Sequence, residues 1–210
     1  MAETAVPNPD TLPEQGYQLL ESVSFEQSLP FFQAYLRRWN LVTITYTGLN
    51  VLILGAVGAW VGVSLAHQKA ELSSHILAFF VGIGLTFLLI PVHELLHALA
   101  YRIAGAQRIR YAVEWRKLMF LTIADGFVIR PKPFCWVILT PFLVLTTLAV
   151  LGLVVGSPGL QFSCLGFLLI HTGACSGDCA LLSFLYEHRH RSIRSYDDAL
   201  NRMSYFYAKV

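Results

Sequence analysis

Pro91-Val92-His93-Glu94-Leu95-Leu96-His97-Ala98-Leu99-Ala100-Tyr101 decides the fold, because it places a His-Glu-x-x-His pattern at the end of a long apolar segment. Positions i and i+4 of a helix lie on the same face, about 6 Å apart along the axis. Two imidazoles placed in this way can bind one Zn²⁺, and the Glu beside the first His can act as general base on water. We therefore expect His93 and His97 to be zinc ligands and Glu94 to be the catalytic base.

The composition is too apolar for an ordinary soluble domain. Hydrophobic residues make up 55% of the chain and charged residues only 13%, whereas about a quarter of a soluble domain is charged. The net charge of +2 gives no reason to expect a nucleic acid partner. The four cysteines lie in or beside apolar segments, which is typical of small buried residues and not of a disulfide framework. We expect one domain embedded in a lipid bilayer.

Four apolar segments are long enough to cross a bilayer, which needs about 20 residues. They are residues 41–66, 75–103, 135–155 and 160–186, and the motif lies at the far end of the second. Pro91 cannot donate to the carbonyl of Phe87, so we expect a kink just before the motif. The predicted fold class is an α-helical integral membrane protein with about four transmembrane helices, in which residues 41–186 form a membrane metallopeptidase-like domain.

A β insertion is predicted over residues 104–134, between the second and third spans. Ile109, Tyr111, Val113 and Trp115 occupy alternate positions, which is the strand period, and residues 118–124 are rich in strand formers. Asp125-Gly126 followed by residues 127–129 is a hairpin signal. We expect a small β-hairpin or sheet at the cytoplasmic surface. Our hypothesis is that one edge binds substrate as an added strand, and the alternative is a purely structural hairpin.

The two ends of the chain are polar segments. Within the N-terminal segment, residues 1–40, we expect residues 1–16 to be loosely attached. Apolar residues at helical spacing over 29–36 predict a short amphipathic helix at the membrane interface, or alternatively an ordinary packed helix. Residues 187–210 are expected to form a cytoplasmic basic tail, with a short surface helix over residues 196–207.

The basic residues predict how the spans are oriented. Of the 15 basic residues, only Lys69 lies in a loop on the other side of the predicted spans, which leaves 14 on one side. By the positive-inside rule that side is cytoplasmic. We therefore expect four spans with both termini in the cytoplasm, and the motif near the cytoplasmic end of the second span.

A third zinc ligand is expected in the fourth span, which runs parallel to the second, because a catalytic zinc usually has three protein ligands and one open position. Asp178 matches the depth of the motif, whereas His171 lies about two helical turns deeper. Asp178 is the favoured ligand, and pairing with Arg189 is its alternative role. His171 remains an alternative ligand or a substrate-binding residue. Cys175 and Cys179 are further donors, ranked lower.

The combination of motifs resembles known peptidases. His93-Glu94-Leu95-Leu96-His97 in a spanning helix, with an acidic residue in a later span, resembles the site-2 protease class of intramembrane metalloproteases. Its pairing with Ser176-Gly177-Asp178 more closely resembles a bacterial family of uncharacterised zincin peptidases, over roughly residues 75–185. The resemblance implies that His93, His97 and Asp178 bind zinc and that Glu94 is the base. The chain departs from the site-2 pattern because Gly177 precedes Asp178 and no Asn-Pro is present.

We interpret the sequence as that of a zinc-dependent intramembrane metalloprotease, a hydrolase of membrane proteins or membrane-proximal peptides, in a bacterial cytoplasmic (inner) membrane. The main alternative is a catalytically inactive metal-binding membrane protein, a chaperone or sensor of transmembrane helices, with His171 or Cys175 blocking the open position. A transporter is the third hypothesis. Transporters often carry internal repeats, and this chain shows no obvious repeat and only four spans.

Overall fold

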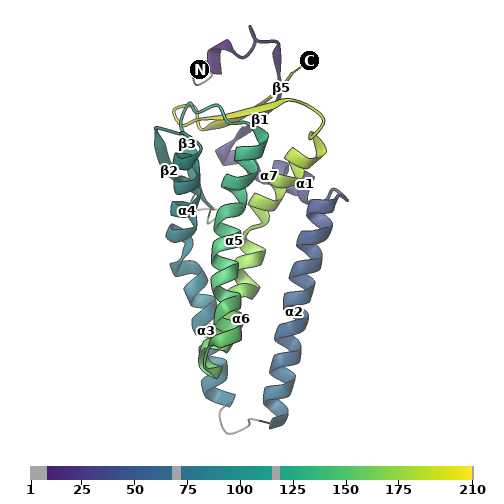
Figure 1. Ribbon diagram of the computed structural model, residues 1–210, viewed down its shortest axis with the longest axis vertical. Helices are drawn as coiled ribbons and strands as arrows, with labels where there is room; N and C mark the ends of the chain where they lie inside the picture. Colours follow the sequence, from purple (N-terminus) through teal and green to yellow (C-terminus); the bar gives the residue numbers. More distant parts are fainter. Residues whose placement is uncertain (1–8, 68–71, 115–118, 210) are drawn as a thin grey trace.

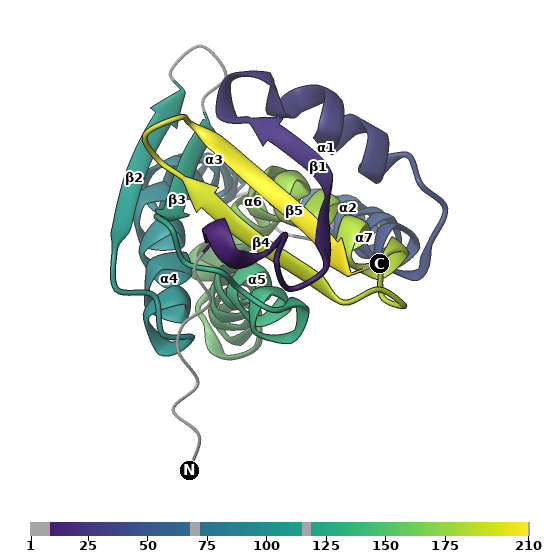
Figure 2. The same cartoon turned by 90° about the horizontal axis from the view of Figure 1, so that it is seen from above.

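The computed structural model describes residues 9–67, 72–114 and 119–209, in which long helices carry two small sheets at one end (Figures 1 and 2). The α-helices are α1 (Ser28–Leu36), α2 (Leu41–His67), α3 (Leu72–Leu88), α4 (Ile90–Ile103), α5 (Pro131–Val155), α6 (Pro158–Ala174) and α7 (Ser176–Glu187). The strands are β1 (Tyr17–Ser24), β2 (Ile109–Glu114), β3 (Met119–Ala124), β4 (Ile193–Asp198) and β5 (Met203–Lys209), and two 3₁₀ turns are η1 (Pro9–Thr11) and η2 (Phe25–Gln27).

The apolar segments form helices of membrane-spanning length. Helices α2 and α5 each satisfy the length and composition of a span, and the pairs α3 with α4 and α6 with α7 satisfy them together. The described chain therefore has two such helices, or up to four if each bent pair is one span. Helix α2 is mostly exposed along its length, with Leu52 68% and Val51 63% accessible. Helix α5 begins at Pro131 and not at the predicted Cys135, because proline is favoured in the first turn of a helix.

The first bent pair changes direction by 45° between Leu88 and Ile90. Pro91 lies in the first turn of α4, where its missing N–H and its ring exclude a continuous hydrogen-bond ladder with α3. The ladder resumes when His93 N–H donates to the carbonyl of Leu89 at 2.9 Å. The predicted kink before the motif is confirmed.

The second bent pair changes direction by 46° at Cys175, where the sequence has no proline. A bend leaves helix carbonyls without partners, and such groups need a donor in an apolar setting. The Tyr46 hydroxyl of α2 lies 3.0 Å from the carbonyl oxygens of both Thr172 and Gly173. Helix α2 therefore stabilises the bend from outside.

Helices α3 and α6 pack backbone against backbone. A Cβ atom on Gly82 would lie 1.8 Å from the carbonyl oxygen of Ser163, and one on Gly166 would lie 2.1 Å from that of Phe79. The Ser163 hydroxyl donates to the carbonyl of Ala78 at 2.8 Å. Glycine at these two positions allows close approach, as in small-residue contacts between membrane helices. This contact holds the two bent pairs side by side and so sets where α4 and α7 lie.

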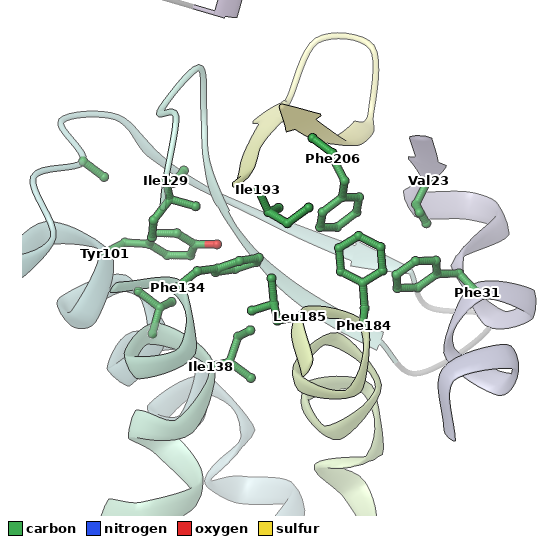
Figure 3. Packing of buried hydrophobic residues seen from close by; sticks show 14 residues of the cluster. Val23, Phe31, Tyr101, Ile129, Phe134, Ile138, Phe184, Leu185, Ile193 and Phe206 are labelled. Carbon is green, nitrogen blue, oxygen red and sulfur yellow. The ribbon is translucent and has the colours of Figure 1, made fainter. Parts of the chain in front are cut away.

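A three-stranded antiparallel sheet in the order β1-β5-β4 covers the ends of the helices (Figure 2). Its inner face contributes Phe206, which is 1% exposed and packs against Phe31 of α1 and Phe184 of α7 (Figure 3). The ring centroids are 5.7 Å and 4.6 Å from that of Phe206. This core fixes α1 and α7 beneath the sheet, so α1 is confirmed as a helix that packs through Phe31.

The expected surface helix over residues 196–207 is wrong. These residues form most of the β4–β5 hairpin, in which Tyr196 pairs with Tyr205. The tight connection is stabilised because the Asp198 carboxylate accepts from the N–H groups of Leu200 and Asn201. Alternation decides the outcome. Phe206 and Ala208 are buried on one face of the sheet, and Tyr207 between them is half-buried on the other face, where it packs against the Leu12 cluster.

Two further predictions are corrected near the sheets. Residues 9–16 are not loosely attached, because Leu12 is fully buried against Tyr17 and Val128; residues 1–8 lie outside the described chain.

The Asp125-Gly126 turn forms, with Gly126 at φ 69°, but residues 127–129 do not return along β3. Ile129 instead pairs with Ser195 of β4, which buries its side chain.

The observed hairpin in this region is β2 with β3, paired from Ile109 opposite Ala124 to Glu114 opposite Met119. The strand period of residues 109–113 and the β-prone run from 119 are confirmed. Trp115 and Leu118, which also belonged to these predictions, lie outside the described residues, as do Arg116 and Lys117.

Candidate metal centre

The two bends bring three predicted site residues together. Helix α4 presents His93 and His97 one turn apart, and the first turn of α7 presents Asp178. The Nε2 atoms of the two histidines are 3.1 Å apart. Asp178 Oδ2 lies 3.3 Å from His93 Nε2, and Asp178 Oδ1 lies 3.4 Å from His97 Nε2.

This triangle has the size that zinc requires. Ligands at 2.0–2.1 Å from a tetrahedral Zn²⁺ lie about 3.3 Å from one another. The three separations of 3.1, 3.3 and 3.4 Å agree with that edge length. The donor set of two imidazoles and one carboxylate is also a common one for catalytic zinc, and it leaves a fourth position open. The residues present therefore fit the metal.

His97 is held in orientation by α5. Its Nδ1 atom lies 2.9 Å from the carbonyl oxygen of Val137, and the side chain is only 11% exposed. A carbonyl accepts and cannot donate, so this hydrogen bond places the proton on Nδ1. Nε2 then keeps its lone pair and faces His93 and Asp178. Such an outer hydrogen bond fixes the tautomer of a metal-binding histidine.

Glu94 lies beside the histidine pair and is anchored by β3. The ligand atoms of His93, Glu94 and His97 lie within 4.8 Å of one another. The Thr122 hydroxyl lies 2.8 Å from Glu94 Oε2 and 2.9 Å from the Glu94 carbonyl oxygen. The β insertion thus contacts the predicted catalytic base directly, a link between residues 28 positions apart.

His171 lies beside His93 and belongs to a different group of ligand atoms from His97. Its ring centroid is 5.9 Å from that of His93, and the side chain is buried between the rings of Phe142 and Phe167. The structure thus brings Asp178 to both histidines of the motif and His171 to only one. Cys175 lies beside His171, whereas Cys179 is buried in the following turn of α7.

A cavity of about 670 Å³ opens onto the three residues. It lies between α1, β3 and the bent helices. Its polar lining includes His93, Glu94, His97 and Asp178, and most of the rest is apolar. A largely apolar pocket of this size with a few convergent polar groups is typical of a ligand-binding or active site.

Sequence reasoning did not find three residues that support the site, namely Thr122, Val137 and Tyr46. Each acts through a contact made far along the chain, and two of the three hydrogen bonds use a backbone carbonyl. Every residue has a backbone carbonyl, so residue identity does not show which carbonyl will accept such a hydrogen bond. Only Thr122 could have been noticed in the sequence, because it is a polar residue inside the β-prone run at 119–124.

Comparison with protein families agrees with the donor set. Residues 86–193, about half of the chain, match the model of a family described as "putative zincin peptidase". The chain belongs to this family. Zincins are zinc-dependent peptidases, so family membership implies zinc as cofactor and supports metallopeptidase activity. The matched range contains both the His93–His97 motif and Asp178. Searches of curated proteins and of solved structures found no match.

Proposed function

We propose that this zincin is an intramembrane metalloprotease, in which His93, His97 and Asp178 hold the zinc and Glu94 is the catalytic base. The observation that carries the proposal is the triangle of ligand atoms with edges of 3.1, 3.3 and 3.4 Å, with the Glu94 carboxylate beside it. The motifs of this chain resemble those of site-2 proteases, and we propose that the residues of these motifs have the same roles here.

Zinc bound in this site would polarise the scissile carbonyl and lower the pKa of water toward about 7. Glu94 accepts the proton from the attacking water and delivers it to the leaving nitrogen. Thr122 keeps the Glu94 carboxylate in one orientation by donating to Oε2. Val137 keeps the ring of His97 in place. The largely apolar walls of the cavity limit the contact of the reacting groups with bulk water, and the side chains of His93 and Asp178 are only 16% and 18% exposed.

We place the helices in a membrane, with the site near its cytoplasmic face. The apolar length of α2, α5 and the two bent pairs supports this placement. The described basic residues lie toward the end that carries the sheets (Figure 1). The positive-inside rule makes that end cytoplasmic, together with both termini. By the family resemblance, the membrane is the bacterial cytoplasmic membrane.

The substrate we propose is a membrane protein or membrane-proximal peptide that extends along β3. Among the described strands β3 is paired on one edge only, with β2, and residues 119–123 line the cavity beside Glu94. An added strand would be held by main-chain hydrogen bonds, which tolerate many sequences. In an antiparallel pair, alternate N–H groups of β3 point to β2 and the others to the open edge. Proline is therefore placed singly at open-edge positions other than Thr122, whose hydroxyl holds Glu94. Unchanged cleavage in every such variant would exclude this mode of binding.

The decisive experiment compares wild type with Glu94→Gln in detergent or liposomes. The variant keeps its side-chain volume and loses the base, so we expect about one zinc per chain in both proteins. Peptide hydrolysis should fall by roughly 10²–10⁴-fold in the variant. Equal activity in the two proteins would remove Glu94 from the mechanism. Substrate capture without turnover by the wild type would favour a chaperone or sensor instead.

A further inference from the structure

A second group of metal-binding atoms lies next to the proposed zinc site. The ligand atoms of His93, His171 and Cys175 all lie within 4.8 Å of one another. His171 Nε2 is 4.0 Å from Cys175 Sγ. In a tetrahedral site with zinc–nitrogen bonds of 2.0–2.1 Å and a zinc–sulfur bond of 2.3 Å, these atoms would be about 3.6 Å apart. The edge between His171 and Cys175 is thus a few tenths of an ångström longer than the tetrahedral value, and the two edges to His93 are no longer than 4.8 Å.

The bend of the second pair creates this arrangement. His171 is in the last turn of α6, and Cys175 is the residue at which the chain turns into α7. Their spacing of four residues is the same as that of His93 and His97, so one turn of helix separates each pair. His171 is 3% exposed and Cys175 4% exposed, and no mechanism proposed above uses either side chain.

The donor set decides which ions would bind. Two imidazoles and a thiolate suit Zn²⁺ and the softer ions, whereas oxygen ligands are preferred by Mg²⁺ and Ca²⁺. The position is reached from the cavity, because His93 and His171 both line it. It is buried, so an ion there would be shielded from bulk water.

We propose that His93, His171 and Cys175 form a second metal position, which binds Zn²⁺ or a softer ion through the Cys175 thiolate and competes with the hydrolytic position for His93. A neutral imidazole coordinates one ion through one nitrogen. An ion held by His171 and Cys175 therefore draws His93 away from His97 and Asp178. This inference rests on the proposed function for its consequence, which is inhibition of hydrolysis by excess zinc or by a soft metal.

The test uses metal-free full-length protein carrying Glu94→Gln, titrated with Cd²⁺ in detergent. A cadmium–thiolate bond gives an ultraviolet charge-transfer band, so the readout does not depend on activity. We expect a band equivalent to one thiolate per chain. Cys175→Ala should abolish it, and His171→Ala should weaken Cd²⁺ binding at least tenfold, the effect of about 1.4 kcal/mol.

The matched control is Cys179→Ala, which removes a buried cysteine one turn further along α7 and should leave the band unchanged. Thermal unfolding of each variant without metal shows that it is folded. A band that survives in Cys175→Ala, or that Cys179→Ala abolishes, would overturn the proposal. So would the absence of any band in protein that still binds zinc.

One further variant separates this inference from the proposed function. Asp178→Ala removes a hydrolytic ligand and should keep the cadmium band. If the band behaves as expected while the wild type hydrolyses no peptide, the second position stands and the protease function fails. If peptides are hydrolysed and no band forms, the protease function stands and the second metal position fails. In active protein, Cys175→Ala should raise the inhibitory zinc concentration at least tenfold.

Discussion

The two bent helix pairs reach the same shape by different means. The α3–α4 pair bends by 45° beside Pro91, and the α6–α7 pair bends by 46° at Cys175 with no proline. The first bend is a local property of its own residues. The second depends on a neighbour, because Tyr46 of α2 donates to the carbonyls that the bend leaves free.

The difference extends to the ligands. His93 and His97 meet because they are four residues apart on one helix, and little else is needed to bring them together. Asp178 reaches them only because α6 packs against α3 and α7 then turns toward α4. Three of the four site residues thus lie together on α4, and the fourth, Asp178, is placed by tertiary contacts. Substitutions at both helix pairs test this difference.

The largest effect is expected from Asp178→Ala. If Asp178 is a direct ligand, as proposed, its removal should weaken zinc binding by more than roughly 100-fold, since even outer hydrogen-bond partners are worth about 10–100-fold. Competition with a chromophoric chelator measures this affinity. His171→Ala is the control and should retain zinc at the hydrolytic site. Zinc kept in Asp178→Ala and lost in His171→Ala would move the third ligand from α7 to α6.

The second largest effect is expected at the contact between α3 and α6, which joins the two bent pairs. Gly82→Ala would place a methyl group 1.8 Å from the carbonyl oxygen of Ser163, and neither backbone can yield cheaply. We expect α3 and α6 to separate, with a loss of stability of about 3 kcal/mol or more, at the upper end of overpacking effects. Thermal unfolding in detergent measures it. Gly84→Ala, where nothing lies within 4 Å, should be tolerated; equal losses in the two variants would reject the close packing.

A smaller effect is expected at Thr122, which touches the first pair from β3. Thr122→Val keeps the shape and removes the hydroxyl that donates to Glu94 Oε2. We expect peptide hydrolysis to fall by about 10- to 100-fold with zinc content unchanged, as for other outer partners of a metal site. Thr122→Ser should restore most of the rate. If Ser and Val reduce the rate equally, packing and not the hydroxyl is responsible.

The smallest effect is expected from Tyr46→Phe. The variant loses a hydrogen bond worth about 1 kcal/mol, which corresponds to a factor of about 5 in stability or zinc affinity. The carbonyls of Thr172 and Gly173 then lack this donor, so Asp178 should be held less firmly. Chelator competition and thermal unfolding are the measurements. Tyr111→Phe, at an exposed tyrosine of β2, should change neither.

The same difference explains what the sequence predicts about the fold and the site. The bend before His93 follows from Pro91, and the positions of the apolar helices follow from segments with few charged residues that are long enough to cross a bilayer. Matching Asp178 to the depth of the motif correctly predicted that the two lie close together. Their roles as ligands remain predictions.

Long-range pairing is what the sequence does not show. β1 pairs with β5, so that Tyr17 lies opposite Lys209, and no local pattern links two segments so far apart. Residues 127–129 carry a hairpin signal, but Ile129 pairs instead with Ser195 of β4. Ile129 is buried in the core beneath the sheet, and Val128 is buried in the separate cluster around Leu12. The contacts of Val137 and Tyr46 use backbone atoms or a distant helix, which residue identity does not reveal.

The strand order β1-β5-β4 also has a consequence for synthesis. β5 is the central strand, yet the ribosome makes it after every helix described above. Until then β1 has no partner, and Phe206 does not yet cover Phe31 and Phe184. All the helices are therefore made before β5 can complete the sheet that covers the cavity. In a nascent chain the histidines and carboxylates of the site would lie in a wider opening, and β5, which contributes Ser204 and Phe206 to the cavity lining, would narrow it only in the last step of folding.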